Sequence, residues 1–399
     1  MIKFSPPDIT EKEREAVCNV LRSGWITTGE KTAEFENKIS QQTGCPKAVC
    51  LSSATAALEM VLRRLEIGVG DEVILPAYTY TATAAAVLHT GAVPVMADTQ
   101  AAGYHIDPEE IARRLTSRTA AVIAVDIGGV MCDYDAIREI LEQAGGKKNE
   151  SRELLRLFGR PILIADAAHS FGSVYRNRKS GMAADFSCFS FHAVKNLTSA
   201  EGGCIVWQKK EGLDDERLYC EFRTMSLHGQ TKDAKTKAES GNWEYDIVYP
   251  GWKCNMTDVH AAIGAAQLER YSGMLEKKKK ICEIYDGVFE GKLGRLRHGG
   301  ADFESNRHLY MINLTGMCEK TEERRNRLAE RLFGKGICCN VHFKPLPLLT
   351  AYRSLGYTME TLPHSLQSYE GELTLPLHTQ LSEQEAYYVA ETVCRELYR

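Results

Sequence analysis

The stretch at residues 47–65, "KAVCLSSATAALEMVLRRL", begins with an apolar run and continues into a helical pattern. The run "KAVCLSS" predicts a buried strand, and "TAALEMVLRRL" predicts a helix with one apolar face. The same order of strand and helix recurs through the first two-thirds of the chain. Further apolar runs, each predicted to be a strand, occupy residues 71–76, 93–98, 120–127, 161–168, 185–194 and 203–207.

Helical patterns lie between several of these runs, at residues 80–91, 107–115 and 133–145. Asp107 and Pro108 provide a start signal for the second of these helices. Strands that are apolar almost throughout and alternate with helices indicate a mainly parallel sheet with both faces covered. We therefore predict an α/β fold built on a mainly parallel central sheet.

The pattern changes after about residue 251. Residues 256–290 predict one long helical stretch, and its charge run "EKKKK" at 276–280 is expected to be a solvated helix face. We expect a large domain at residues 1–255 and a smaller α+β domain at residues 256–399. The smaller domain is predicted to have strands at residues 308–314 and 337–343, and helices at residues 321–333 and 382–397.

The composition is ordinary for a soluble globular protein, with 399 residues, 44% hydrophobic and 26% charged. A net charge of -4 argues against nucleic-acid partners and against a membrane surface. No apolar run approaches the roughly 20 residues of a membrane span, and the first residues lack the apolar core of a signal peptide. The chain is therefore expected to be cytoplasmic.

The 13 cysteines are scattered, and none forms a C-x-x-C pair. Several lie inside apolar runs, such as Cys188 and Cys204. This distribution is typical of small buried hydrophobes in a reducing compartment. We expect no zinc site and no other metal site.

Polar residues follow the predicted strands at three places, and ligands of an open parallel sheet bind beyond the carboxyl ends of its strands. Ser52, Ser53 and Thr55 stand between a strand and a helix start. Backbone N–H groups, hydroxyls and the helix dipole at such a place can bind a phosphate. The alternative is that these residues only cap the helix.

Asp166 ends an apolar run, and His169 follows it. A carboxylate there could hold a proton on a heteroaromatic nitrogen, although it could instead be a helix cap. Lys195 follows the run at 185–194. A partly desolvated lysine loses its charge and becomes a nucleophilic amine, whereas a surface lysine would only lay its stem on the protein.

These three places together supply what pyridoxal phosphate requires, which is an anion cradle, an acid for the pyridine nitrogen and a lysine for the aldehyde. Tyr78 and Tyr80 could offer an aromatic face to the ring, or could pack in the core. Ser190 precedes Lys195 and could add a phosphate contact.

With these motifs, the chain resembles the DegT/StrS family of pyridoxal-phosphate-dependent nucleotide-sugar aminotransferases over nearly its whole length. The resemblance implies the aspartate-aminotransferase type of fold and a homodimer with active sites at the subunit interface. The matching stretches are "SGWITTGEKTAEFE" (23–36), residues 51–98, "ADAAHSFGS" (165–173), "FSFHAVKNLTSAEGG" (189–203), "PGWKCNMTDVHAAIGAAQLER" (250–270), "NVHFKPL" (340–346) and "LTLPLH" (373–378).

The resemblance implies that Lys195 binds the aldehyde of the cofactor and that Asp166 pairs with its pyridine nitrogen. One branch of the family has histidine in place of the lysine and dehydrates sugars, so Lys195 favours transamination. Further cofactor contacts implied by the resemblance are Tyr80 on the ring, Thr55, Ser190 and the backbone of Ala56 at the phosphate, and His169 nearby.

The segment "GWKCN" (251–255) resembles a loop that reaches into the neighbouring subunit's site. Many relatives have asparagine at the position of Lys253, so either Lys253 or Asn255 is expected to meet the partner's phosphate. Substrate contacts are implied at Thr27, Thr28, His192 and His342.

The activity implied by the resemblance is transfer of an amino group from glutamate to a nucleotide-linked keto-sugar, in the biosynthesis of amino sugars for surface polysaccharides. The segment "GWKCNMTD" is most similar to the branch acting at carbon 4 of UDP-sugars, which favours a 4-keto over a 3-keto sugar. One alternative is an aminotransferase of a non-sugar ketone such as a keto-cyclitol. Another is a non-catalytic regulator, against which the intact pair of Lys195 and Asp166 argues.

Overall fold

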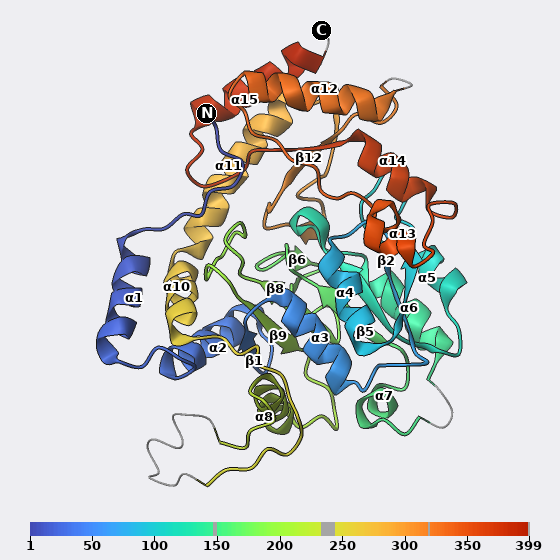
Figure 1. Cartoon of the computed structure of the whole chain (residues 1–399). Coiled ribbons are helices and arrows are strands. Elements are labelled where there is room, and N and C mark those ends of the chain that lie inside the picture. The colour runs from blue at the N-terminus through green and yellow to red at the C-terminus, as the bar shows by residue number, and fades with distance from the viewer. Residues whose placement is uncertain (147–149, 233–243, 318–319, 398–399) are drawn as a thin grey trace.

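A seven-stranded sheet with helices on both faces forms the body of this computed structural model (Figure 1). The structure describes residues 1–146, 150–232, 244–317 and 320–397. The strand order is β1-β9-β8-β5-β4-β2-β3. The strands are β1 Ala48–Leu51, β2 Glu72–Pro76, β3 Val93–Ala97, β4 Thr119–Val125, β5 Ile162–Asp166, β8 Phe186–Ser190 and β9 Gly203–Trp207.

Most neighbours in this sheet are parallel, which confirms the predicted α/β class. The pairs β2–β3, β2–β4, β4–β5 and β5–β8 are parallel, whereas β9 is antiparallel to both β8 and β1. Gly203, the first residue of β9, pairs with Ser190 on one side and with Leu51 on the other. The start of β9 therefore lies at the edge where β1 and β8 end.

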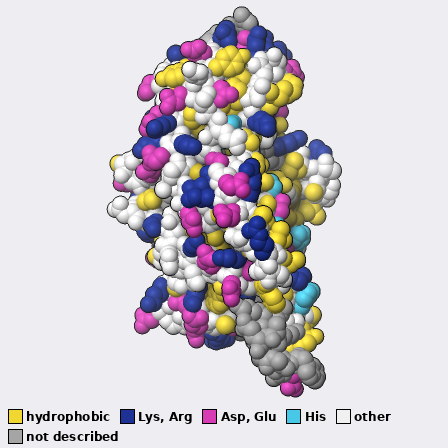
Figure 2. Space-filling model, turned by 90° about the vertical axis from the view of Figure 1, so that its left-hand side faces the viewer, with side chains coloured by type: hydrophobic (Ala, Val, Ile, Leu, Met, Phe, Trp, Pro, Cys, Tyr) yellow, Lys and Arg dark blue, Asp and Glu magenta, His cyan; other side chains and the backbone are white. Residues whose placement is uncertain are grey.

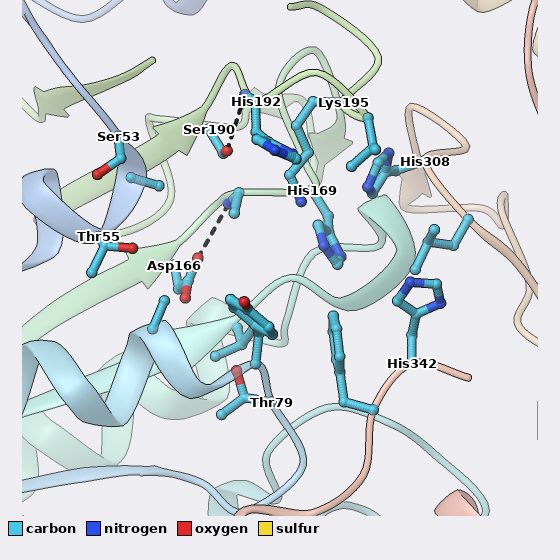
Figure 3. A pocket seen from close by; sticks show the side chains of 18 of the residues that line it. Ser53, Thr55, Thr79, Asp166, His169, Ser190, His192, Lys195, His308 and His342 are labelled. Carbon is cyan, nitrogen blue, oxygen red and sulfur yellow. Dashed lines mark hydrogen bonds between the residues drawn. The ribbon is translucent and has the colours of Figure 1, made fainter. Parts of the chain in front are cut away.

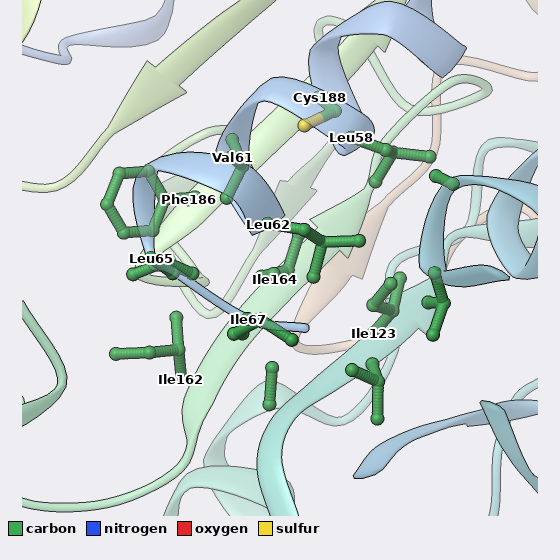
Figure 4. Close-up of a cluster of buried hydrophobic side chains, with 14 of the residues drawn as sticks. Leu58, Val61, Leu62, Leu65, Ile67, Ile123, Ile162, Ile164, Phe186 and Cys188 are labelled. Atoms are coloured by element: carbon green, nitrogen blue, oxygen red, sulfur yellow. The ribbon is translucent and has the colours of Figure 1, made fainter. Parts of the chain in front are cut away.

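Apolar layers cover the two faces of the sheet, and the strands have continuous apolar runs because both faces are buried. Figure 4 shows part of one layer, in which Leu58 and Leu62 of α3 pack near Ile164 and Phe186 of the sheet. Full burial of each such side chain contributes about 1.5–3 kcal/mol. This layer includes α3 Ala54–Arg64, α4 Thr81–Thr90, α7 Glu153–Phe158 and α8 Asp215–Ser226.

The opposite layer also contains α10, against which the first helix of the chain packs. Its helices are α2 Glu30–Thr43, α5 Pro108–Arg114, α6 Tyr134–Ala144 and α10 Asp258–Glu269, with α1 Glu11–Ser23 outside them.

A third cluster of buried apolar side chains lies among the C-terminal helices and a three-stranded sheet, β10-β12-β13. The domain boundary after residue 255 stays a prediction. The elements around this cluster are α11 Tyr271–Phe289, β10 Gly294–Arg295, β12 Tyr310–Asn313, α12 Thr321–Gly334, α14 Pro363–Gly371, β13 Glu372–Leu375 and α15 Glu383–Leu397. The shorter elements are η1 Ile127–Gly129, β6 Val174–Tyr175, β7 Arg178–Lys179, β11 Phe303–Glu304, η2 Leu346–Leu348 and α13 Thr350–Ser354.

The prediction of one long helix at residues 256–290 is wrong, because the structure has two helices there, α10 and α11. Arg270 separates α10 from α11, because its backbone leaves the helical region at φ -112° and ψ 7°. Its guanidinium donates to Glu13 Oε1 of α1 over 2.8 Å. The prediction that the charge run 276–280 is wholly solvated is also wrong, since Lys278 is 4% exposed.

The predicted strand at residues 337–343 is also absent as a regular strand. Ile337 pairs with Ile2, and Asn340 pairs with Thr374, each as an isolated bridge. The two bridges connect this segment to two different parts of the chain, so no continuous ladder of backbone hydrogen bonds forms. The chain beyond Asn340 then turns towards the cavity described below.

The surface carries charges of both signs. Figure 2 shows basic and acidic side chains interspersed over one face, with hydrophobic side chains gathered along one edge. A mixed surface of this kind produces no large field of a single sign. Among the helices of the described residues, none combines the length and the apolar character that crossing a membrane requires.

Candidate active site

Lys195 lies in a turn beyond β8, not at the end of a strand. Ser190, the last residue of β8, pairs with Gly203, the first residue of the antiparallel strand β9. The chain between these two residues must therefore reverse its direction. The N–H of Phe191 donates to the carbonyl of Gly202 over 2.8 Å and closes the turn at its base. Burial lowers the pKa of the Lys195 amine to about 8, against the opposing effect of the Asp166 charge. The amine is thus much closer to its neutral, nucleophilic form at pH 7 than an exposed lysine.

Asp166 is the last residue of β5 and is 6% exposed. The hydroxyl of Thr83 donates to Oδ2 over 2.7 Å, and the N–H of Ala168 donates to Oδ1 over 3.3 Å. Burial raises the pKa of Asp166, although Thr83, Ala168 and the charge of Lys195 counteract this. A carboxylate that is fixed and more basic than usual is suited to hold a proton on a ring nitrogen.

The start of α3 forms a cradle next to the end of β8. Ser53 caps this helix, and its Oγ accepts from the N–H of Ala56 over 3.1 Å. A Cβ added to Gly203 would lie 2.4 Å from the backbone nitrogen of Ala54, so β9 passes directly against the helix start. The hydroxyls of Thr55 and Ser190 line the adjoining cavity. The first turn of α3 contains no acidic residue, which suits an anion at its N-terminus.

Three imidazoles face the same cavity and are neutral at pH 7, with His169 and His308 buried and His342 half-buried. Burial is the main cause that lowers the pKa of His169 and of His308 well below the usual range, and it lowers the pKa of His342 to about 3. The charge of Lys195 acts in the same direction on all three. His192, by contrast, is exposed and its Nε2 lies 3.5 Å from Glu201.

All these groups surround one cavity of about 340 Å³ (Figure 3). Its lining includes eight of the thirteen residues expected at the site, so the structure brings together segments that follow four different strands. These residues are Thr55, Tyr80, Asp166, His169, Ser190, His192, Lys195 and His342. Ala56 lies one residue beyond the lining, with its N–H used by the Ser53 cap.

The remaining four expected residues form a separate cluster outside the cavity of their own chain. Lys253 Nζ donates to Asn255 Oδ1, and Asn255 Nδ2 donates to Thr28 Oγ1 over 2.6 Å. The carbonyl of Thr27 accepts from the backbone N–H of Asp258 over 3.2 Å. The structure thus joins the two loops that the sequence assigned separately to the cofactor and to the substrate.

Several residues of the site have no clear signal in the sequence. His308 comes from the segment before β12, and its ring lies 4.4 Å from that of His169. Phe343 stacks on His169 at 5.9 Å and approaches Tyr80 at 5.8 Å. Phe4 of the N-terminal segment also lines the cavity. Only distance in the folded chain identifies these residues, because sequence spacing places none of them near Lys195.

The site fits pyridoxal phosphate in three independent respects. The amine of Lys195 suits an aldehyde, and the buried carboxyl of Asp166 suits the protonated ring nitrogen. The helix start beside Gly203, where a side chain would collide with the backbone, leaves the N–H groups of α3 close to an anion site. Among the described residues, no group of three or more histidine, cysteine or carboxylate side chains is placed to hold a metal ion.

The fold and these groups together define a pyridoxal-phosphate enzyme of the aminotransferase type. The chain belongs to the DegT/DnrJ/EryC1/StrS aminotransferase family, whose model matches residues 7–394. It is a pyridoxal-phosphate-dependent sugar aminotransferase, as the resemblance of its motifs implied.

Relatives of known sequence and structure cover the whole chain. The spore coat polysaccharide biosynthesis protein SpsC of Bacillus subtilis is 34% identical over 398 residues, covering 98% of this chain and 96% of its own. Spr1654 from Streptococcus pneumoniae, assigned as a sugar aminotransferase, was solved in its PLP form with a TM-score of 0.95 and 46% identity, covering 100% of this chain and 98% of its own. PseC of Helicobacter pylori, an aminotransferase of pseudoaminic acid biosynthesis, has a TM-score of 0.86 and 25% identity, covering 100% and 99%.

The residues of the cavity have separate tasks in transamination. Bound pyridoxal phosphate supplies an electron-withdrawing ring and carries the amino group between the two substrates. Lys195 would hold the cofactor at its aldehyde, and its amine would be placed to move a proton at the donor's α-carbon. Asp166 would keep the ring nitrogen protonated, and the hydroxyl of Thr83 donates to Asp166 and fixes its carboxylate.

Proposed function

We propose that this enzyme transfers the amino group of glutamate to carbon 4 of a nucleotide-linked keto-hexose, as a step in making an amino sugar for a surface polysaccharide. The observation that carries the proposal is the composition of the cavity wall. Beside Lys195 it holds neutral imidazoles, hydroxyls and aromatic rings. Imidazoles and hydroxyls can bond sugar hydroxyls, and rings can cover the C–H faces of a hexose.

The similarity to a spore coat polysaccharide biosynthesis protein supports the polysaccharide context. The preference for carbon 4 rests on the likeness of "GWKCNMTD" to the branch acting on UDP-4-keto-sugars. A keto-cyclitol remains the competing acceptor, because aminotransferases of cyclitols share these motifs.

We further propose that the active unit is a homodimer in which each site uses both chains. Among the described residues that line the cavity, Lys195 is the sole lysine or arginine. In this proposal its amine is taken up by the aldehyde. The phosphate dianion and the carboxylates of glutamate therefore need cations from elsewhere. Lys253 lies outside its own cavity and is exposed, so it is available to the site of a partner.

Exposed apolar side chains next to this loop support an interface there. Ile247 is 45% exposed and Val248 is 53% exposed, just before the loop that carries Lys253. Large exposed apolar groups in one short segment are typical of a surface that another chain covers. The location of the protein in the cytoplasm belongs to the same proposal, since its nucleotide-sugar substrates are made there.

The decisive experiment follows the two half-reactions on the purified holoenzyme by its visible absorption band. Glutamate should remove the band of the lysine-bound cofactor, and a UDP-4-keto-hexose should restore it. A UDP-3-keto-hexose and a keto-inositol serve as matched acceptors. Restoration by keto-inositol alone would replace the sugar by a cyclitol, and a band that no amino donor removes would contradict glutamate-dependent transamination.

A further inference from the structure

Lys278 is a buried lysine behind the active site. It lies on α11 and is 4% exposed, although Lys277 and Lys280 beside it are exposed. Its Nζ donates to Asn196 Oδ1 over 2.5 Å and to the backbone carbonyl of His308 over 3.1 Å. Both acceptors adjoin the active-site wall, since His308 lines the cavity and Asn196 directly follows Lys195, which also lines it.

Burial of the Lys278 amine lowers the stability of the folded chain. A gain in stability therefore does not explain its position. An amine without a carboxylate partner loses its hydration in a buried place. Burial accordingly lowers the pKa of Lys278 to about 7. A methionine of similar length would fill the same space at no such cost.

The contacts of Asn196 fix the orientation of its side-chain amide. Its Nδ2 donates to the carbonyl of Asn306 over 2.7 Å. The other end of the amide, Oδ1, therefore faces both Lys278 Nζ and His308 Nδ1, the latter at 3.3 Å. Because Oδ1 can only accept, Nδ1 of His308 carries the hydrogen, and its Nε2 keeps a free lone pair.

His169 has the opposite arrangement. The N–H of Gly128 donates to His169 Nδ1 over 3.2 Å, so the hydrogen of this ring is on Nε2. The two rings lie 4.4 Å apart, and both line the cavity (Figure 3). The pair therefore presents one hydrogen-bond donor and one acceptor, from two neutral histidines.

From this geometry we propose that Lys278 is a positioning residue of the transamination site. Through Asn196 it fixes the chain next to Lys195 and keeps His308 with Nε2 as an acceptor. That acceptor suits an ammonium or hydroxyl hydrogen of a substrate. The inference rests on the proposed glutamate half-reaction, which supplies its kinetic readout.

The test compares Lys278→Met with Lys280→Met, a matched change on the exposed side of the same helix. In histidine-labelled apoprotein, the ¹⁵N signals of His308, assigned with His308→Gln, should show the Nδ1–H form in the wild type and in Lys280→Met. Lys278→Met and Asn196→Ala should shift them towards the Nε2–H form. If Lys278 only stabilised α11, the substitution would lower the stability of the helix and leave the ¹⁵N signals of His308 unaltered.

The single-turnover rate with glutamate gives the second readout. The rate should fall by up to about 100-fold in Lys278→Met, because the Lys195 amine would no longer be held in the orientation that the reaction requires. In Lys280→Met the rate should stay unchanged. The double variant Lys278→Met/Asn196→Ala should be no slower than the slower single variant. Both changes remove the same hydrogen bond between Lys278 and Asn196, so their effects should not add. Lys278→Gln, which keeps N–H donors, should recover part of the rate.

Two results would overturn the proposal. One is a folded Lys278→Met with wild-type His308 signals and rate, and the other is fully additive losses in the double variant. If Lys278→Met does not fold, Lys278→Gln and Asn196→Ala carry the same comparison. If glutamate does not remove the visible band of the wild type, the proposed half-reaction is contradicted. The ¹⁵N signals of His308 would then be the test of the role of Lys278.

Discussion

The hydroxyl oxygen of Thr83 lies 2.7 Å from Oδ2 of Asp166 and links the first turn of α4 to the end of β5. Thr79 Oγ1 lies 2.9 Å from Thr83 Oγ1 and extends the chain of hydroxyls. Thr83 gives its one hydrogen to the carboxylate, so it accepts from Thr79. Asp166 is thus held by a residue of α4, the helix that follows β2, although β4 separates β2 from β5 in the sheet.

Asp166→Asn should slow the glutamate half-reaction by roughly a thousandfold, about 4 kcal/mol in activation free energy, because the ring nitrogen loses its proton. Thr83→Val keeps the carboxylate and removes one hydrogen bond, so it should cost only about tenfold. Stopped-flow absorbance on the holoenzymes measures both. An asparagine variant that reacts at nearly the wild-type rate would reduce Asp166 to a cap.

The capture of pyridoxal phosphate by apoprotein should depend on pH with a midpoint at about 8, the pKa of Lys195. The neutral amine is the nucleophile, so the rate rises with pH below this value and levels off above it. An exposed lysine would still gain rate up to about pH 10. Absorbance at several pH values checks the midpoint, with Lys195→Ala as the variant that forms no band. A midpoint near 10 would contradict the lowered pKa of this amine.

Gly203→Ala should weaken cofactor binding and lower the unfolding free energy by about 1–3 kcal/mol. The added Cβ would lie 2.4 Å from backbone atoms of Ser53 and Ala54, which cannot yield as a side chain does. Gly273→Ala is the matched control, because nothing lies within 4 Å of its added Cβ. Inside α11 it should stabilise by up to about 1 kcal/mol. Denaturant unfolding measures the change in stability, and cofactor titration measures the change in affinity. An unchanged cofactor affinity in Gly203→Ala would contradict a phosphate site at the start of α3.

Mixed dimers of Lys195→Ala and Lys253→Ala chains should be more active than either parent. If Lys253 serves the partner's cofactor, one site of each mixed dimer has both residues intact. Lys253→Ala alone should weaken cofactor retention, since one charge-assisted hydrogen bond contributes about 1.5–3 kcal/mol. Co-expression with two different tags isolates the mixed dimer for assay. Activity no higher than that of the parents would place Lys253 within its own site or outside any site.

Much of the fold follows from local patterns, because β2, β4 and β5 are buried on both faces and their apolar runs are unbroken. The acid and the lysine were predictable for a related reason. Asp166 is a charged residue placed directly after such a run, and Lys195 follows another. The physical cost of a charge beside a buried strand makes Asp166 conspicuous, whereas Lys195 lies in the turn beyond β8.

The rest depends on contacts between segments distant in sequence. His308 and Phe343 reach the cavity from the C-terminal part of the chain, and no spacing rule relates them to Lys195. Lys278 lies in a run of lysines typical of a solvated face, and only the packing of α11 on the active-site wall buries it. The break at Arg270 also depends on a distant partner, the buried Glu13.

The reversed strand β9 determines when the active site can form during synthesis of the chain. Within the described sheet, β1 is an edge strand whose single neighbour is β9, although about 150 residues separate them. A nascent chain that stops before Gly203 has the cradle residues but lacks the strand that pairs with both Leu51 and Ser190. Contacts so distant in sequence form slowly and late. On the ribosome, the enzyme should therefore acquire its cofactor only after β9 has left the exit tunnel.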